Sequence, residues 1–198
     1  MGVYFDQYMT FDKHIDEVST KVMGTLIYLN RFKDSFETDT RLIVIQALAL
    51  SIINYCFKVW GSACNLHLSR VQKLQNFAAR VANGNIRKYE HISPYLKELQ
   101  WIKIKDKYTY DICIIVFKVL RKYFPDWLYI FNNISSVHGI NTRQSNNLIV
   151  QRTKTELGSR QMHTRGPYLW NKLPEVIRNA TSLSSFKGKL KRHILDSS

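Results

Sequence analysis

The sequence predicts a mainly α-helical protein, in which a helical bundle is followed by a small basic extension of mixed α and β structure. Three observations support this fold class. Apolar residues recur at helical spacing from Phe11 to Leu29. Residues 42–57 carry no charged side chain over 16 positions, which is typical of a helix buried in the centre of a core. Hydrophobic residues make up 45% of the 198-residue chain, enough for a folded core.

The first half of the chain divides into a short strand and three long helices. In order, we expect a strand over residues 2–5 and helices over about 12–32, 39–60 and 66–83. Thr10 or Asp12 can cap the first of these helices, and Thr38 or Asp39 the second. Gly84 follows the third, and glycine is the residue that most often ends a helix.

The second half contains shorter elements. Pro94 stands at a position that favours a helix start, and Gly166 with Pro167 predicts a turn or a short helix. The β-branched run 112–116 could form a strand, but the length of the surrounding apolar pattern favours a helix. The expected elements are helices over about 93–99, 104–123, 174–179 and 183–195, a turn over 125–131, and strands at 148–150 and 158–164.

A change of composition divides the chain. After residue 131 the helical periodicity disappears, and Asn, Ser, Gly and His become frequent. Such a segment is typical of a linker. The expected organisation is a strand segment at 1–7, a helical domain at 8–131, a linker at 132–141 and a basic C-terminal extension at 142–198.

The chain is strongly basic, and the excess is concentrated near its C-terminal end. Lys and Arg number 29 against 15 Asp and Glu, a formal net charge of +14. Residues 1–135 carry 18 basic and 12 acidic side chains, a net of +6, whereas residues 136–198 carry 11 and 3, a net of +8. A surface of this kind attracts polyanions, so nucleic acid is the expected partner. An acidic protein, an anionic membrane lipid and an ordinary solvated surface remain as alternatives.

Individual cations can be selected as candidate phosphate ligands. Three of them lie along one flank of the expected helix 66–83, within roughly 80° of arc. Others alternate with the aromatic residues Tyr168 and Trp170, which we expect to serve mainly as core residues, although an exposed ring could stack on an unpaired base. The candidates for nucleic-acid binding are Arg70, Lys73, Arg80, Arg152, Lys154, Arg160, Arg165, Lys172, Lys187, Lys191 and Arg192.

The sequence predicts no catalytic residue, no metal site and no cofactor. Polymerase chemistry uses two Mg²⁺ ions held by close carboxylates, and only Asp12 and Asp16, one helical turn apart, resemble such a pair. Cys64 and His67 have half of the spacing of a zinc site, but no matching second pair follows. The three cysteines cannot all pair within one chain, which favours a reducing compartment. We therefore expect a cytoplasmic or nuclear protein that is neither secreted nor membrane-bound.

Six short motifs in a fixed order resemble one family of proteins. They are GVYFD at 2–6, VWGSA at 59–63, RVQKLQNFAAR at 70–80, YLKELQW at 95–101, RTKTELG at 152–158 and RGPYLWNKLP at 165–174. In this order they resemble the region that follows the polymerase palm in LINE-type, jockey-like non-LTR retrotransposon reverse transcriptases. The resemblance covers nearly the whole chain. The metal-binding aspartates of that family lie upstream of the matching region, and this chain has no counterpart of them.

The resemblance implies a thumb-like helical domain that grips a primer–template duplex by its backbone, followed by the C-terminal extension. It also implies that residues 1–7 are the remnant of a strand without its sheet neighbours. The expected function is sequence-independent binding of RNA or an RNA–DNA duplex, without catalysis by this chain alone. A decayed transposon remnant with no selected function is one alternative. A module that docks on a polymerase domain through residues 2–5 is another, and the oligomeric state stays open.

Overall fold

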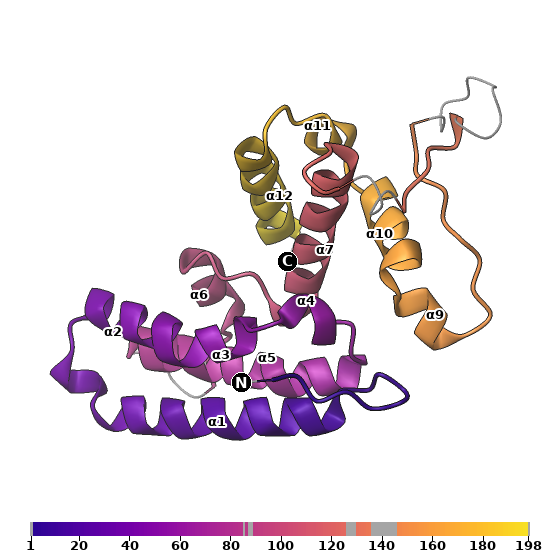
Figure 1. The fold of residues 1–198 in the computed structure, drawn as a ribbon. Coiled ribbons are helices and arrows are strands. Elements are labelled where there is room, and N and C mark those ends of the chain that lie inside the picture. Colours follow the sequence, from indigo (N-terminus) through magenta and orange to yellow (C-terminus); the bar gives the residue numbers. More distant parts are fainter. Residues whose placement is uncertain (1, 85, 87–88, 126–129, 136–145, 198) are drawn as a thin grey trace. The chain divides into compact units, whose positions relative to one another are not determined.

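The chain forms two compact units, each built from helices (Figure 1). The computed structural model describes residues 2–84, 86, 89–125, 130–135 and 146–197. Unit 1 spans Met1–Tyr108 and unit 2 spans Thr109–Ser197, and helix α7 (Ile104–Leu120) contributes to both. The expectation of a mainly α-helical protein is therefore confirmed. No helix within the described ranges is long and apolar enough to cross a membrane.

Unit 1 is organised around two long helices that lie side by side, α1 and α5 (Figure 1). Ile15, Val22 and Leu26 of α1 are fully buried, as are Val71 and Ala78 of α5. These side chains fall on one stripe of each helix, which is why the helical periodicity of both segments was readable in the sequence. The elements of unit 1 before α7 are α1 (Asp12–Arg31), η1 (Lys33–Ser35), α2 (Thr38–Ile45), η2 (Gln46–Leu50), α3 (Ser51–Asn54), α4 (Phe57–Trp60), α5 (Asn65–Asn83) and α6 (Ser93–Glu98).

The start of α1 is held by a residue that the sequence analysis did not select. The Asp6 carboxylate accepts hydrogen bonds from the backbone N–H groups of Tyr8, Thr10 and Phe11, at 3.0, 3.0 and 2.8 Å, and from the Thr10 hydroxyl at 3.0 Å. These bonds lower the pKa of Asp6 to about 2, and the bond from the Thr10 N–H makes the largest contribution. Capping by Thr10 or Asp12 was the wrong expectation, because Phe11 is the N-cap residue and makes no side-chain bond.

The expected single helix over 39–60 is interrupted. A π-helical segment, η2, follows α2, and the chain turns at Tyr55 and Cys56, where Cys56 has a left-handed φ of 50°. The segment packs through one stripe that includes Ile45 and Ile53. Its other side is open to solvent, with 66% of Ile43 exposed. The expectation of a helix buried in the centre of the core was wrong for this side, because an uncharged sequence does not require a neighbour on every face.

Helix α5 ends as the sequence predicts, and a buried arginine completes its terminus. Gly84 has a φ of 79°, a conformation that glycine adopts without strain. Arg41 of α2 donates hydrogen bonds to the carbonyl oxygens of Ala82 and Asn83, at 2.7 and 3.3 Å, and to that of Lys33 at 2.8 Å. A guanidinium at this place pairs the carbonyl groups that a helix end leaves without intrahelical partners.

Unit 2 has an aromatic core formed by one residue from each of three helices. Phe117 of α7 stacks on Phe186 with ring centroids 4.4 Å apart, and Trp170 lies 5.7 Å from Phe186. Gly166 lets α10 approach closely, since a Cβ atom there would come within 3.1 Å of Val116. The helices of unit 2 after α7 are α9 (Glu156–Arg160), α10 (Met162–Asn171), α11 (Glu175–Arg178) and α12 (Leu183–Ser197).

None of the three expected strands is present, so the α+β character of the extension is a wrong expectation. Residues 2–5 and 149–150 belong to no helix or strand. Leu148 forms only an isolated antiparallel bridge with Asn133. Residues 158–164 are divided between α9 and α10. Helix α9 forms because Thr155 caps its start, where the Thr155 hydroxyl accepts a hydrogen bond from the Gly158 N–H at 3.1 Å. Most of the expected linker, 136–141, and most of the expected turn, 126–129, lie outside the described residues.

Candidate nucleic-acid interface

The C-terminal helix α12 presents three of the candidate cations. Its apolar stripe, which includes Phe186 and Leu190, is buried. Lys187 and Lys191 are one turn apart, and Arg192 follows around the helix. Lys187 and Arg192 are exposed, Lys191 is half-buried, and none of the three pairs with a carboxylate in the described part of unit 2. Their charges are therefore available to a polyanion.

Helix α10 combines two candidate cations with an exposed aromatic ring. Tyr168 is 40% exposed. The Arg165 guanidinium carbon lies 5.3 Å from the centre of the Tyr168 ring, and the Lys172 Nζ lies 4.2 Å from it. Lys172 also donates a hydrogen bond to the Tyr168 hydroxyl oxygen at 2.6 Å. This bond lowers the pKa of Tyr168, because a nearby cation favours the phenolate.

The two aromatic residues of this segment have different environments. Trp170 is only 5% exposed and packs in the aromatic core, which confirms the expectation of a structural role. Tyr168 instead lies at the surface between Arg165 and Lys172, so the same expectation was wrong for its ring.

The remaining candidates of unit 2 lie before α10. Arg152 and Lys154 are exposed in the segment that leads into α9, with no ion-pair partner among the described residues. Arg160, at the end of α9, is half-buried, and its Nε lies 4.0 Å from a carboxylate oxygen of Glu156. Arg160 is thus partly neutralised on its own helix, whereas the other two are open to an incoming phosphate.

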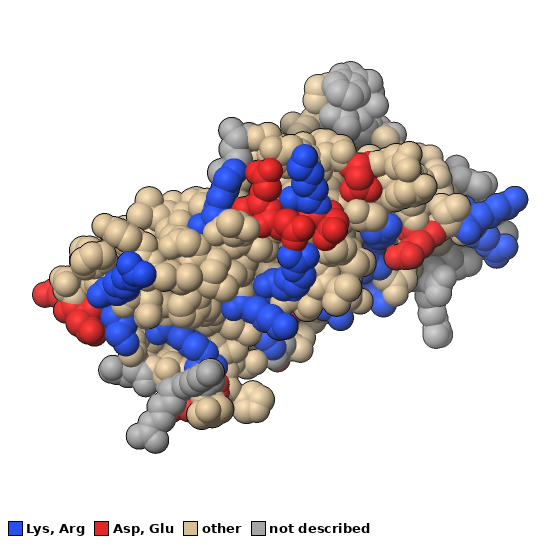
Figure 2. Space-filling view, turned by 90° about the horizontal axis from the view of Figure 1, so that it is seen from below, with Lys and Arg blue, Asp and Glu red and all other residues tan. Residues whose placement is uncertain are grey.

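The flank of α5 in unit 1 is largely engaged within the protein. Arg70 pairs with Asp16 and, at 3.4 Å, with Asp12 of α1. The hydrogen bond to Asp16 raises the pKa of Arg70. The Nδ1 of His67 also lies 3.2 Å from the Asp12 carboxylate. In Figure 2, seen from the α1 side, acidic side chains gather directly beside basic ones. A phosphate would have to displace these carboxylates.

The other two cations of the α5 flank differ from each other. Arg80 donates a hydrogen bond to the carbonyl oxygen of Glu90 at 2.8 Å and holds the segment after α5. Lys73 is exposed and has no ion-pair partner within the described ranges. The three residues lie on the same helix, but only Lys73 presents an unengaged charge.

The described residues form no group of three His, Cys, Asp or Glu side chains that could hold a metal ion. The cysteines are all free thiols. Cys113 is buried in α7, and burial raises its pKa to about 12, so its reactive thiolate form is suppressed.

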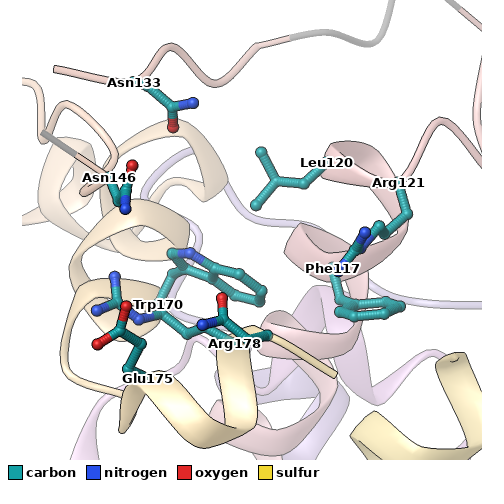
Figure 3. A pocket seen from close by; sticks show the side chains of 9 residues that line it. Phe117, Leu120, Arg121, Asn133, Asn146, Trp170, Glu175 and Arg178 are labelled. Carbon is teal, nitrogen blue, oxygen red and sulfur yellow. The ribbon is translucent and has the colours of Figure 1, made fainter. Parts of the chain in front are cut away.

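A pocket in unit 2 adds polar residues that the sequence analysis did not select. Figure 3 shows the Trp170 indole with Asn133 and Asn146 on one side and Arg121 of α7 on the other. Arg178 of α11 also lines this pocket. The sequence signal for the pocket is the high asparagine content of 132–147, a composition that is also typical of a linker.

Comparison with known proteins finds a distant relative. Over 87 residues the chain is 26% identical to a probable RNA-directed DNA polymerase from transposon X-element of Drosophila melanogaster. The match covers 42% of this chain and 10% of that protein. No family model and no solved structure matches the chain. The partial homology supports a transposon-derived, reverse-transcriptase-like origin.

Proposed function

We propose that this chain binds RNA or an RNA–DNA duplex through the phosphate backbone, without reading the base sequence, as part of a retrotransposon RNA-directed DNA polymerase. The observation that carries the proposal is the set of unneutralised cations in unit 2. These cations are Arg152, Lys154, Lys187, Lys191 and Arg192, supplemented by Arg165 and Lys172 around Tyr168. The distant similarity to a transposon polymerase supports the same conclusion.

The spacing of these cations suits a polyanion. Side chains one helical turn apart, such as Lys187 and Lys191, have Cβ atoms about 5–6 Å apart. A nucleic-acid duplex carries one charge per roughly 1.7 Å of its axis when both strands are counted. Neighbouring cations can therefore contact successive phosphates, and flexible lysine side chains make such contacts without regard to base identity. Tyr168 adds an exposed ring that can stack on an unpaired base.

A salt titration tests this proposal. A fluorescently labelled RNA–DNA duplex is titrated with the protein at several KCl concentrations, and binding is followed by fluorescence anisotropy. If about five phosphates are contacted, log K should fall with log salt with a slope of roughly −4 to −5. Duplexes of different sequence should give the same slope and Kd. Absent binding in low salt, or binding that is indifferent to salt, would refute the proposal.

We further propose that this chain has no polymerase activity by itself. Phosphoryl transfer of this kind depends on metal ions held between carboxylates. The only neighbouring pair that the sequence offered, Asp12 and Asp16, is occupied by Arg70 and His67. Incubation with a primed RNA template, Mg²⁺ and dNTPs should give no extended primer. Extension by highly purified protein that is lost in an Asp16→Asn variant would overturn this conclusion.

Docking on a polymerase domain is a second candidate function, and exposed apolar side chains of unit 1 favour it. Tyr28 and Phe32 lie at the C-terminal end of α1 with ring centroids 5.0 Å apart, and 62% of Tyr28 is exposed. The relative is also a much longer protein, since the match covers 10% of it. Co-purification with the remaining part of that polymerase should be lost in a Tyr28→Ser, Phe32→Ser variant. Retention of the complex by this variant would remove the candidate.

A further inference from the structure

The pocket of unit 2 lies beside the aromatic core and has a mixed polar and apolar lining. Its volume is about 290 Å³. Seven residues give the pocket its chemical character, and they are Arg121, Asn133, Asn146, Trp170, Glu175, Arg178 and Asn179. They supply two guanidinium groups, three carboxamides and one carboxylate around an indole ring (Figure 3). A volume near the lower end of the roughly 300–1,000 Å³ of small-molecule pockets suits one group about the size of a nucleotide.

The wall that carries the asparagines is fixed by hydrogen bonds. Asn171 of α10 binds the backbone of Leu148 twice, accepting its N–H at 2.9 Å and donating to its carbonyl oxygen at 2.8 Å. Arg178 donates to the side-chain oxygen of Asn147 at 2.9 Å. The Ile134 N–H, next to Asn133 in the chain, donates to the carbonyl oxygen of Asn147 at 2.9 Å. The pocket is therefore formed before any ligand arrives, which lowers the entropic cost of binding.

One donor of the pocket residues is left without a partner. The Nε of Arg178 is buried and makes no hydrogen bond within the described part of the chain. A buried donor without an acceptor is unfavourable, and such groups in native proteins are usually satisfied. Among the described residues, Arg121 uses one of its nitrogen atoms for a side-chain hydrogen bond, to the Ala180 carbonyl oxygen at 2.9 Å. Arg121 therefore keeps N–H donors that a ligand can use.

We propose that this pocket holds the base of one unpaired nucleotide of the bound nucleic acid. The inference rests on the nucleic-acid binding proposed above and adds a site for a single-stranded end or bulge. Carboxamide, carboxylate and guanidinium groups are the partners that base edges use for hydrogen bonds, because they offer donors and acceptors together. Unpaired bases of RNA are commonly held in this way, against an aromatic ring.

The lining carries charges of both signs, and its one carboxylate is the group that suits a base better than a phosphate. Glu175 is exposed and has no ion-pair partner among the described residues, so its carboxylate would repel an anion. The same carboxylate can accept a hydrogen bond from a base amino group. The phosphates of the bound strand are assigned instead to cations outside the pocket, such as Lys187 and Lys172.

The first test compares two duplexes and two pocket variants. One RNA–DNA duplex is blunt, and the other carries one unpaired nucleotide at an end. The wild-type protein should bind the second about tenfold more tightly, as expected for one held base. Asn146→Leu, which removes an amide, and Leu120→Trp, which fills the space, should both abolish this preference while the blunt duplex is bound as before. Asn65→Leu in unit 1 is the matched control and should keep the preference.

A second test uses small molecules and is independent of duplex binding. Nucleoside monophosphates are titrated into ¹⁵N-labelled protein, and the Trp170 indole N–H signal is followed by NMR. The signal should shift with a nucleotide and stay unchanged with ribose 5-phosphate, which lacks the base. Equal shifts with both ligands, or no shift with any nucleotide, would overturn the inference.

The two proposals fail in distinguishable ways. Equal binding of the blunt and overhanging duplexes by the wild-type protein would refute the base pocket and leave backbone binding intact. A tenfold preference that survives in both pocket variants would refute it as well, because the base would then be held elsewhere. Loss of all duplex binding, together with a nucleotide-specific shift of the Trp170 signal, would refute the backbone proposal and retain the pocket.

Discussion

Removal of the α12 charges gives the sharpest test of the interface. The variant Lys187→Gln, Lys191→Gln, Arg192→Gln deletes three cations, none of which has a carboxylate partner in the described part of the chain. Each phosphate contact contributes about 0.9 to the slope of log K against log salt. The slope should therefore become less steep by about 2.7. At 0.15 M salt this corresponds to roughly a hundredfold weaker binding, and the difference should nearly vanish towards 1 M.

The matched control is another arginine that the sequence also selected. Arg70→Gln removes one formal charge, but Arg70 is paired with Asp12 and Asp16. We expect the slope to change by less than about 0.3, because a neutralised cation releases no counterion from the duplex. Fluorescence anisotropy at five or more salt concentrations, with circular dichroism to confirm the fold, measures both variants. The double variant Asp12→Asn, Asp16→Asn should instead steepen the slope, since it frees Arg70.

This prediction would be refuted if Arg70→Gln changed the salt slope as much as the α12 variant does, or more. In that case the ion pairs of unit 1 would not determine which cations bind phosphate. A uniform loss of affinity at all salt concentrations would also contradict it, because that pattern indicates a structural defect and not a lost phosphate contact.

Three further predictions concern the protein without its partner. Arg41→Met should lower the free energy of unfolding of unit 1 by about 3 kcal/mol in urea titrations, because three backbone carbonyl groups lose a charged donor. The control variant Arg31→Met should change this free energy by less than about 0.5 kcal/mol. Burial lowers the pKa of His14 below 6.5, so the unfolded chain binds the proton more readily. Stability should therefore fall as the pH drops below about 6.5, and His14→Gln should flatten this dependence. In thiol labelling at pH 8 followed by mass spectrometry, Cys113 should react only after unfolding, whereas the exposed Cys56 reacts in the native protein.

The long helices could be predicted from the sequence because their signals are local. Helix α5 begins and ends within one residue of the expected bounds, since its apolar stripe and Gly84 are both adjacent features of the chain. Helix α12 begins at the expected residue, Leu183, and ends two residues later than expected, at Ser197. Its first turn is capped by Ser182, whose hydroxyl accepts the Ser185 N–H at 3.2 Å. Periodicity and caps act over a few residues, so they are readable without tertiary information.

The short elements could not be predicted in this way because their structure depends on distant contacts. Residues 158–164 have a composition compatible with a strand, but a strand needs a partner to pair its backbone groups. Helix α10 is placed so that Gly166 lies close to Val116 and Phe131, which are distant in the sequence. Its internal Pro167, read from the sequence as the start of an element, lies inside that helix. Neither neighbour is identifiable from the local sequence.

The difference between local signals and distant contacts is even clearer for the candidate site. Net charge and its concentration near the C-terminal end follow from counting, but a phosphate responds only to charges that the protein has not already neutralised. Arg70 is separated from Asp12 by 58 residues and from Asp16 by 54, so no local pattern reveals that these three side chains meet. Lys187 and Arg192 face solvent because the apolar stripe of their own helix requires it. For cations on the exposed side of an amphipathic helix, the sequence alone therefore indicates that the charge is available to phosphate. For cations beside a second helix, the structure is needed to show whether a carboxylate neutralises them.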